Sequence, residues 1–151
     1  MGKKAVIKED VSESLKEQEK IESNIKKSSG SASASKKFES SKFYIASTYN
    51  NTIITVTDDK GAVLAWSSSG NLGFKGPRKA TPYAATSIVE GLIQKLKKFD
   101  LGKISILVKG VGGGREAAVR ALINQGLDIQ SIKDVTPVAH NGPRRKKARR
   151  V

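Results

Sequence analysis

The stretch KISILVKGVGGGREAAVRALINQGLDIQSIKDVT (103–136) contains the signals of a strand, a helix and a second strand. Its first seven residues, KISILVK, include four aliphatic side chains and predict a strand, and the glycines of 110–114 end that strand. REAAVRALINQ (115–125) is rich in helix formers, and Gly126 is a typical C-terminal cap. Residues 127–136 predict the next strand. Two strands that flank a helix are expected to be parallel with a right-handed connection, so the stretch predicts an α/β unit.

Three further strands and a helix precede this unit. FYIAST (43–48), TIITVTD (52–58) and AVLAWSS (62–68) are β-rich, and the residues between them favour tight turns, so two hairpins are predicted. Thr81 is a suitable N-cap for a helix whose first residue is Pro82. The order β-β-β-α-β-α-β predicts an α/β fold: a mixed five-stranded sheet with a helix on each face or nearby.

Composition limits the partners more than the fold. The chain has 151 residues, enough for one domain, with 28 Lys and Arg against 14 acids and a net charge of +14. Such a charge indicates a polyanionic partner, which is a nucleic acid or an anionic membrane. The absence of cysteine and the single histidine, His140, exclude thiolate chemistry and Cys or His metal clusters. We therefore expect no enzyme activity, no metal and no cofactor.

The charge divides the chain into three zones. Residues 1–42 carry ten lysines and seven acids, and their Glu/Lys/Ser-rich composition predicts a disordered extension, with folding on a partner as the alternative. Residues 43–136 form the predicted α/β domain. Residues 137–151 carry six basic residues and no acid, which predicts an extended arm that lies along phosphates. No apolar run is long enough for a membrane span and no secretory signal is evident, so we expect a cytoplasmic protein without membrane contact.

The glycine-rich turn allows three interpretations. A strand, a glycine turn and a helix N-terminus bring free N–H groups together, which suits an RNA phosphate. Gly112, Gly114 and Ala117 also fit the spacing of a dinucleotide site, with Asp134 as the acid that would bind ribose. A tight turn without a ligand is the third. The strong positive charge and the single βαβ unit that the sequence predicts favour RNA over a nucleotide.

The loop GFKGPRKATP (73–82) is the second predicted RNA contact. Lys75, Arg78 and Lys79 lie between glycines and a proline just before a helix, where clustered cations suit backbone phosphates. Phe74 either stacks on a base or anchors the loop in the core. A solvated run of charges is the alternative for the cations.

Four motifs resemble one known family: STYNNT (47–52), WSSSGNLGFKGPRKATPYAA (66–85), VKGVGGGREAAVRAL (108–122) and DVTPVAHNGPRRKKARRV (134–151). Their sequence and order are similar to those of the family of small-subunit ribosomal protein number eleven. The resemblance runs from about residue 37 to the end. It differs where Val111 replaces a common proline, and where Pro143 replaces the cysteine that usually follows HNG.

The resemblance implies a ribonuclease-H-like fold and a structural role on the platform of the small subunit, near the exit-site messenger RNA path. The partners that it implies are small-subunit ribosomal RNA and the small-subunit proteins number seven, eighteen and twenty-one. The RNA contacts implied by the matching motifs are Lys75, Arg78, Lys79, Gly112, Gly113, Gly114, Arg115, Asn141, Arg144, Arg145, Lys146, Lys147, Arg149 and Arg150.

Overall fold

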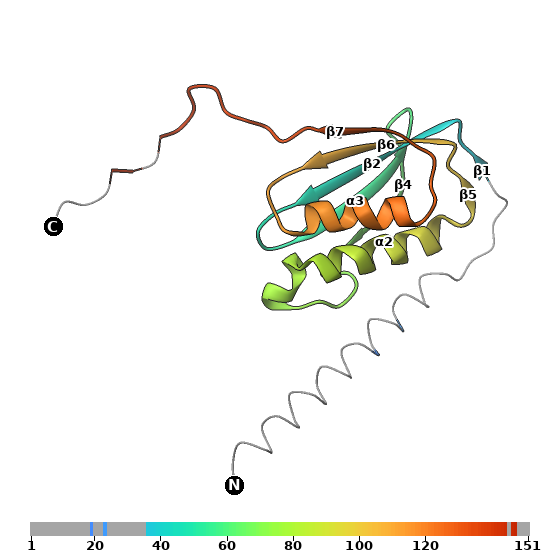
Figure 1. The fold of residues 1–151 in the computed structure, drawn as a ribbon, viewed down its shortest axis with the longest axis horizontal. Coiled ribbons are helices and arrows are strands. Elements are labelled where there is room, and N and C mark those ends of the chain that lie inside the picture. The colour runs from blue at the N-terminus through green and yellow to red at the C-terminus, as the bar shows by residue number, and fades with distance from the viewer. Residues whose placement is uncertain (1–18, 20–22, 24–35, 145, 148–151) are drawn as a thin grey trace, which may run out of the picture.

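The computed structural model describes residues 19, 23, 36–144, 146 and 147. Two sheets and two α-helices make up the body (Figure 1). Along the chain the elements are β1 (Lys36–Lys37), β2 (Ser40–Ser47), β3 (Thr52–Asp58), β4 (Val63–Ser68), the 3-10 helix η1 (Gly76–Ala80), α2 (Pro82–Leu96), β5 (Phe99–Asp100), β6 (Lys103–Lys109), α3 (Gly114–Asn124) and β7 (Ile129–Asp134).

The predicted order of strands and helices is confirmed by the main sheet and its two helices. However, β2, the first strand of the main sheet, begins at Ser40 rather than at the predicted Phe43. In addition, β1 pairs with β5 as a small second sheet that was not predicted. β2 begins early because its first residues bond to the distant segment around Leu101 and Lys103. The Ser41 hydroxyl donates to the Leu101 carbonyl at 2.8 Å, and the Lys103 N–H donates to the Glu39 carbonyl at 3.2 Å. Polar residues without a strand pattern are thus drawn into the sheet by pairing with a distant segment.

The main sheet has the strand order β4-β3-β2-β6-β7. β3 is antiparallel to its neighbours β2 and β4, whereas β2, β6 and β7 pair in parallel. It follows that β2, β4, β6 and β7 all run in the same direction. Their carboxyl ends therefore meet at one edge of the sheet, which we call the carboxyl edge.

Both helices cover the same face of the sheet and pack against each other (Figure 1). A helix on each face or nearby was expected; the structure has both helices on one face, and the topology explains why. The connection through α2 leads from β4 across two strands to β6, and the connection through α3 continues in the same direction to β7. Two right-handed crossovers that advance in one direction place their helices on one face.

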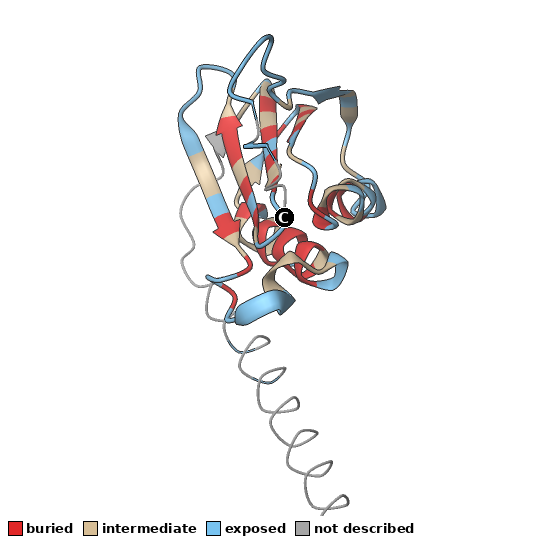
Figure 2. Cartoon of the chain, turned by 90° about the vertical axis from the view of Figure 1, so that its left-hand side faces the viewer, coloured by how far each residue is buried: buried red, intermediate tan, exposed pale blue. Residues whose placement is uncertain are grey.

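The core lies between this face and the helices, where the buried positions gather (Figure 2). Alternate residues of the central strands point into it, and α2 contributes an apolar stripe in which Ile88, Val89 and Leu92 are buried. The largest fully buried apolar side chains are Phe43, Ile45, Ile54, Val56, Ile88, Val89, Leu92, Ile104, Ile106 and Leu122. Burial of one such side chain contributes about 1.5–3 kcal/mol.

Candidate nucleic-acid interface

The glycine turn lies at the carboxyl edge, where it packs on the β2–β3 hairpin. The Gly112 N–H donates to the Ser47 carbonyl at 3.0 Å. A Cβ atom on Gly110 would lie 2.1 Å from the Ser47 carbonyl oxygen, and one on Gly112 would lie 2.2 Å from the Thr48 carbonyl oxygen. At Gly114 the atom in the way is Thr52 Oγ1, at 2.5 Å. These glycines are therefore required by contacts within the protein.

Gly113 differs from its neighbours. A Cβ atom there would have the Ala80 carbonyl oxygen as its nearest neighbour, at 3.7 Å, and the backbone φ of −65° suits any residue. Gly113 is the N-cap of α3, and no side chain caps that helix end. The Arg115 N–H donates to the Gly112 carbonyl at 3.2 Å, and no side chain blocks the approach of an anion to this helix end.

Arg115 is held by the protein itself. Its guanidinium donates to the Gly110 carbonyl at 3.0 Å and to Thr136 Oγ1 at 3.4 Å, and it forms an ion pair with Asp134. The Thr136 hydroxyl and N–H donate to the other Asp134 oxygen at 2.6 and 2.8 Å. The Gly110 N–H in turn donates to Thr136 Oγ1 at 3.0 Å. We call Gly110, Arg115, Asp134 and Thr136 the tail clamp, because they join the glycine turn to the start of the tail.

The tail clamp was not foreseen from the sequence. Hydrogen bonds from Arg115 and then from Thr136 hold the pKa of the Asp134 carboxyl far below its ordinary value. Asp134 is therefore bonded within the protein, which leaves it unsuited to bind a ribose. A signal was present, because Asp-x-Thr at the end of β7 permits a local side-chain hydrogen bond and Arg115 lies in the first turn of the helix that precedes β7.

The loop between β4 and α2 brings cations to the same edge. Lys75 and Arg78 are exposed and Lys79 is partly exposed, around the short helix η1. Thr81 ends this loop as predicted: its hydroxyl accepts from the Ala84 N–H at 3.2 Å and so caps α2. A Cβ atom on Gly113 would lie in ordinary van der Waals contact with the Ala80 carbonyl oxygen, so the end of the loop lies beside the glycine turn.

Phe74 anchors the loop. Its side chain is buried and meets the ring of Tyr83 edge to face, with 6.0 Å between the ring centroids. The Phe74 N–H donates to the Ser69 carbonyl at 3.1 Å, and the Ser69 hydroxyl bonds Asn51 of the β2–β3 turn. Of the two roles left open for Phe74, the structure therefore supports the core anchor.

The tail leaves the body at the tail clamp. In Figure 1 the described chain beyond β7 runs away from the sheet and helices. Asn141 has a positive φ of 51°, which asparagine tolerates. Asn141, Arg144, Lys146 and Lys147 are exposed, and Arg145, Arg149 and Arg150 lie outside the described residues.

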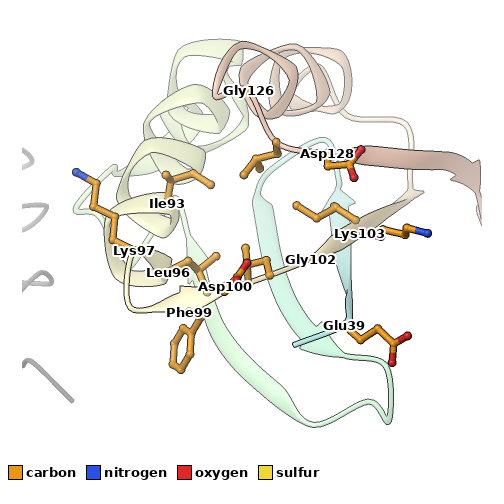
Figure 3. A pocket seen from close by; sticks show the side chains of 13 residues that line it. Glu39, Ile93, Leu96, Lys97, Phe99, Asp100, Gly102, Lys103, Gly126 and Asp128 are labelled. Atoms are coloured by element: carbon orange, nitrogen blue, oxygen red, sulfur yellow. The ribbon is translucent and has the colours of Figure 1, made fainter. Parts of the chain in front are cut away.

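The opposite end of the sheet has a different character. A hollow of about 560 Å³ lies there beside β5 and the start of β6 (Figure 3). Aliphatic side chains line it together with the carboxylates of Glu39, Asp100 and Asp128 and the ammonium groups of Lys97 and Lys103. Three carboxylates against two ammonium groups give the hollow a net negative charge, so it is the weaker candidate for a polyanion.

The described residues supply little for other site classes. They contain no group of His, Cys, Asp or Glu side chains suited to hold a metal, and none of their helices is long and apolar enough to cross a membrane. The dinucleotide interpretation also meets a steric objection. The space in front of Gly112 and Gly114, where a pyrophosphate would approach, is filled by Thr48 and Thr52.

Comparison with known proteins identifies the family of this chain. The model of the family described as ribosomal protein S11 matches residues 41–150. Small ribosomal subunit protein uS11 of Treponema pallidum (strain Nichols) is 51% identical over 108 residues, which cover 72% of this chain and 86% of that protein. The protein of the same name from Borreliella burgdorferi (strain ZS7) is 50% identical over 108 residues, covering 72% and 83%. The chain therefore belongs to the ribosomal protein S11 family of the small ribosomal subunit.

Proposed function

We propose that this structural constituent of the small ribosomal subunit binds ribosomal RNA through its carboxyl edge. The contacts are the cationic loop (Lys75, Arg78, Lys79), the start of α3 (Gly112, Gly113, Gly114, Arg115) and the tail (Asn141, Arg144, Arg145, Lys146, Lys147, Arg149, Arg150). The protein acts as a structural member of the subunit and not as an enzyme.

The convergence of three separate segments supports this proposal best. The loop, the helix start and the exit of the tail lie apart in the sequence, yet contacts at Ala80, Gly113 and Thr136 bring them to one edge. Phosphate neutralisation by cations supplies most of the affinity of such an interface. The start of α3, which no side chain caps, adds a place where the backbone itself meets a phosphate.

Within this interface Arg115 has a positioning role. Both of its terminal nitrogens already donate to groups of the protein, so its main effect is to fix the glycine turn and the direction of the tail. A guanidinium has five N–H donors, so Arg115 can still contact a phosphate through the donors that its bonds within the protein do not use.

The finer assignments extend this proposal. The family resemblance supports a location on the platform near the exit-site messenger RNA path, with small-subunit proteins number seven, eighteen and twenty-one as neighbours. It also supports the ribonuclease-H-like description of the fold. We further propose three functional parts: residues 1–42 as an extension, 43–136 as the RNA-binding domain and 137–151 as the arm. The end of the extension already belongs to the sheets of the domain, because β1 is Lys36–Lys37 and β2 begins at Ser40. Most of the extension lies outside the described residues. Amide exchange on the free protein tests this division, with little protection expected in residues 1–35.

Two measurements test the proposal. The full chain should sediment with small subunits in a sucrose gradient and remain with them at moderate salt. The second measurement compares the RNA affinity of two double variants. One combines Lys75→Ala with Arg78→Ala at the carboxyl edge, and the control combines Lys60→Ala with Lys97→Ala. Each pair removes two exposed lysine or arginine side chains, but Lys60 and Lys97 lie at the opposite end of the molecule. Equal losses for the two pairs would contradict an interface at the carboxyl edge.

A further inference from the structure

The face of the sheet that α2 and α3 leave uncovered has an unusual row of side chains. Strand register places Trp66, Thr55, Tyr44, Leu107 and Lys133 opposite one another, one on each of the five strands. On the three central strands, β3, β2 and β6, the neighbours of these residues are buried in the core, so the row points away from the helices. We call this side of the sheet the open face.

The open face is partly apolar. Tyr44 is 39% exposed and Trp66 is 55% exposed, and Ile53 and Val63 lie beside them with 40% and 58% of their surface accessible. A sheet face that only meets water usually carries polar side chains at its outward positions. Two exposed aromatic rings beside exposed aliphatic residues therefore indicate a surface that another molecule covers.

The charges of the open face indicate which kind of molecule. Within the five strands of the main sheet, the outward positions include four lysines and no acid; the lysines are Lys42, Lys103, Lys109 and Lys133. Lys42 is paired with Asp59 at 2.9 Å. Lys103, Lys109 and Lys133 are exposed along the strands β6 and β7. A partner complementary to this face is negatively charged and presents flat apolar groups.

We propose that the open face is a stacking platform for unpaired RNA bases, with Tyr44 and Trp66 under the bases and Lys109 and Lys133 beside the phosphates. The inference rests on the proposed RNA-binding function and adds a second surface to it. Exposed aromatic rings next to cations are the usual elements of single-strand recognition, because every base has a π-face. The two rings lie two strands apart, roughly 9.6 Å, so each supports its own base.

The chain offers a direct probe of this face. Trp66 is its only tryptophan, so fluorescence excited in the indole band comes from the open face alone. Titration of the full chain with a twelve-nucleotide oligoadenylate should quench this fluorescence, because a stacked base quenches indole emission. An RNA duplex of the same length should bind the cationic edge and leave the fluorescence almost unchanged.

Variants separate stacking from general binding. Tyr44→Ala should weaken oligoadenylate binding roughly five- to hundred-fold, the range for loss of one stacked base. Tyr44→Phe keeps the ring and should restore the parent affinity. Tyr49→Ala removes a tyrosine that is 78% exposed outside the open face, and Trp66 should still be quenched at saturation. Circular dichroism of each variant verifies that it is folded.

The outcomes distinguish this inference from the proposed function. If anisotropy shows that a labelled oligoadenylate binds while Trp66 fluorescence does not change, the platform is refuted and RNA binding by the carboxyl edge stands. If neither RNA binds, both ideas fail. A Thr55→Cys variant adds a single thiol to a chain without cysteine. A photo-crosslinker attached to this thiol reports, in assembled small subunits, which molecule lies on the open face. Adducts with ribosomal RNA would support the platform, whereas adducts with a protein alone would overturn it.

Discussion

Replacement of Gly112 by alanine tests whether the glycine turn is shaped by the protein or by its ligand. A Cβ atom at this position would lie 2.2 Å from the Thr48 carbonyl oxygen and 2.5 Å from Ser47 Oγ. Ordinary van der Waals contact begins near 3.4 Å, so the turn and the hairpin must separate by more than 1 Å. Overpacking of this kind typically costs 1–3 kcal/mol, and we expect the upper part of that range because the obstructing atom belongs to the backbone.

Gly113→Ala is the matched control. The same added methyl group meets nothing closer than 3.7 Å, so the free energy of unfolding should stay within about 0.5 kcal/mol of the parent. Urea denaturation of both variants measures the difference directly. For a folded body of about 100 residues, a loss of 2–3 kcal/mol lowers Tm by roughly 8–24 °C. Equal stability of Gly112→Ala and Gly113→Ala would refute the packing explanation for the glycines.

Four further outcomes are expected. Deletion of residues 144–151 removes six cations and should flatten the slope of log affinity for RNA against log salt by about 2–4 units, measured by filter binding. Gly113→Val should weaken RNA binding while the protein stays folded, because it adds bulk where the backbone meets RNA; binding equal to the parent would make the turn purely structural. Thr81→Ala should cost about 1 kcal/mol in urea denaturation through loss of the α2 cap, with Thr81→Ser close to the parent. The lowered pKa of Asp134 means that its ion pair with Arg115 stabilises the fold above the unfolded pKa of about 3.9 and is lost as pH falls further; Asp134→Asn should therefore show a smaller loss of stability between pH 5 and pH 2.

Much of the fold was predictable because its signals are local. The spacing of Ile88, Val89 and Leu92, the cap at Thr81 and the glycine at 126 define their elements without reference to distant residues. β1, β5 and the first residues of β2 were missed because their pairing partners lie about 60 residues away in the chain. The shared face of the helices follows from strand order, which composition and periodicity do not contain.

The candidate site was predictable to a similar degree. The cationic loop and the glycine turn are visible as motifs, and their proximity at one edge follows from parallel strands. The roles of individual residues were less accessible. The tail clamp depends on distances between Arg115, Asp134 and Thr136 that only the folded chain defines, and Phe74 needed Tyr83 beside it to be assigned to the core.

The central position of β2 has a consequence for biosynthesis. A chain made from its N-terminus completes β2, β3 and β4 before β6 exists, yet β6 is the other neighbour of β2. Until Lys103–Lys109 arrives, one edge of β2 lacks its partner, and Phe43 and Ile45 lack the helices that later cover them. Unpaired edges with exposed apolar residues favour association between incomplete chains. The chain is therefore most exposed to aggregation when β2, β3 and β4 have been synthesised and β6 has not. At that stage a chaperone also has the most surface to recognise.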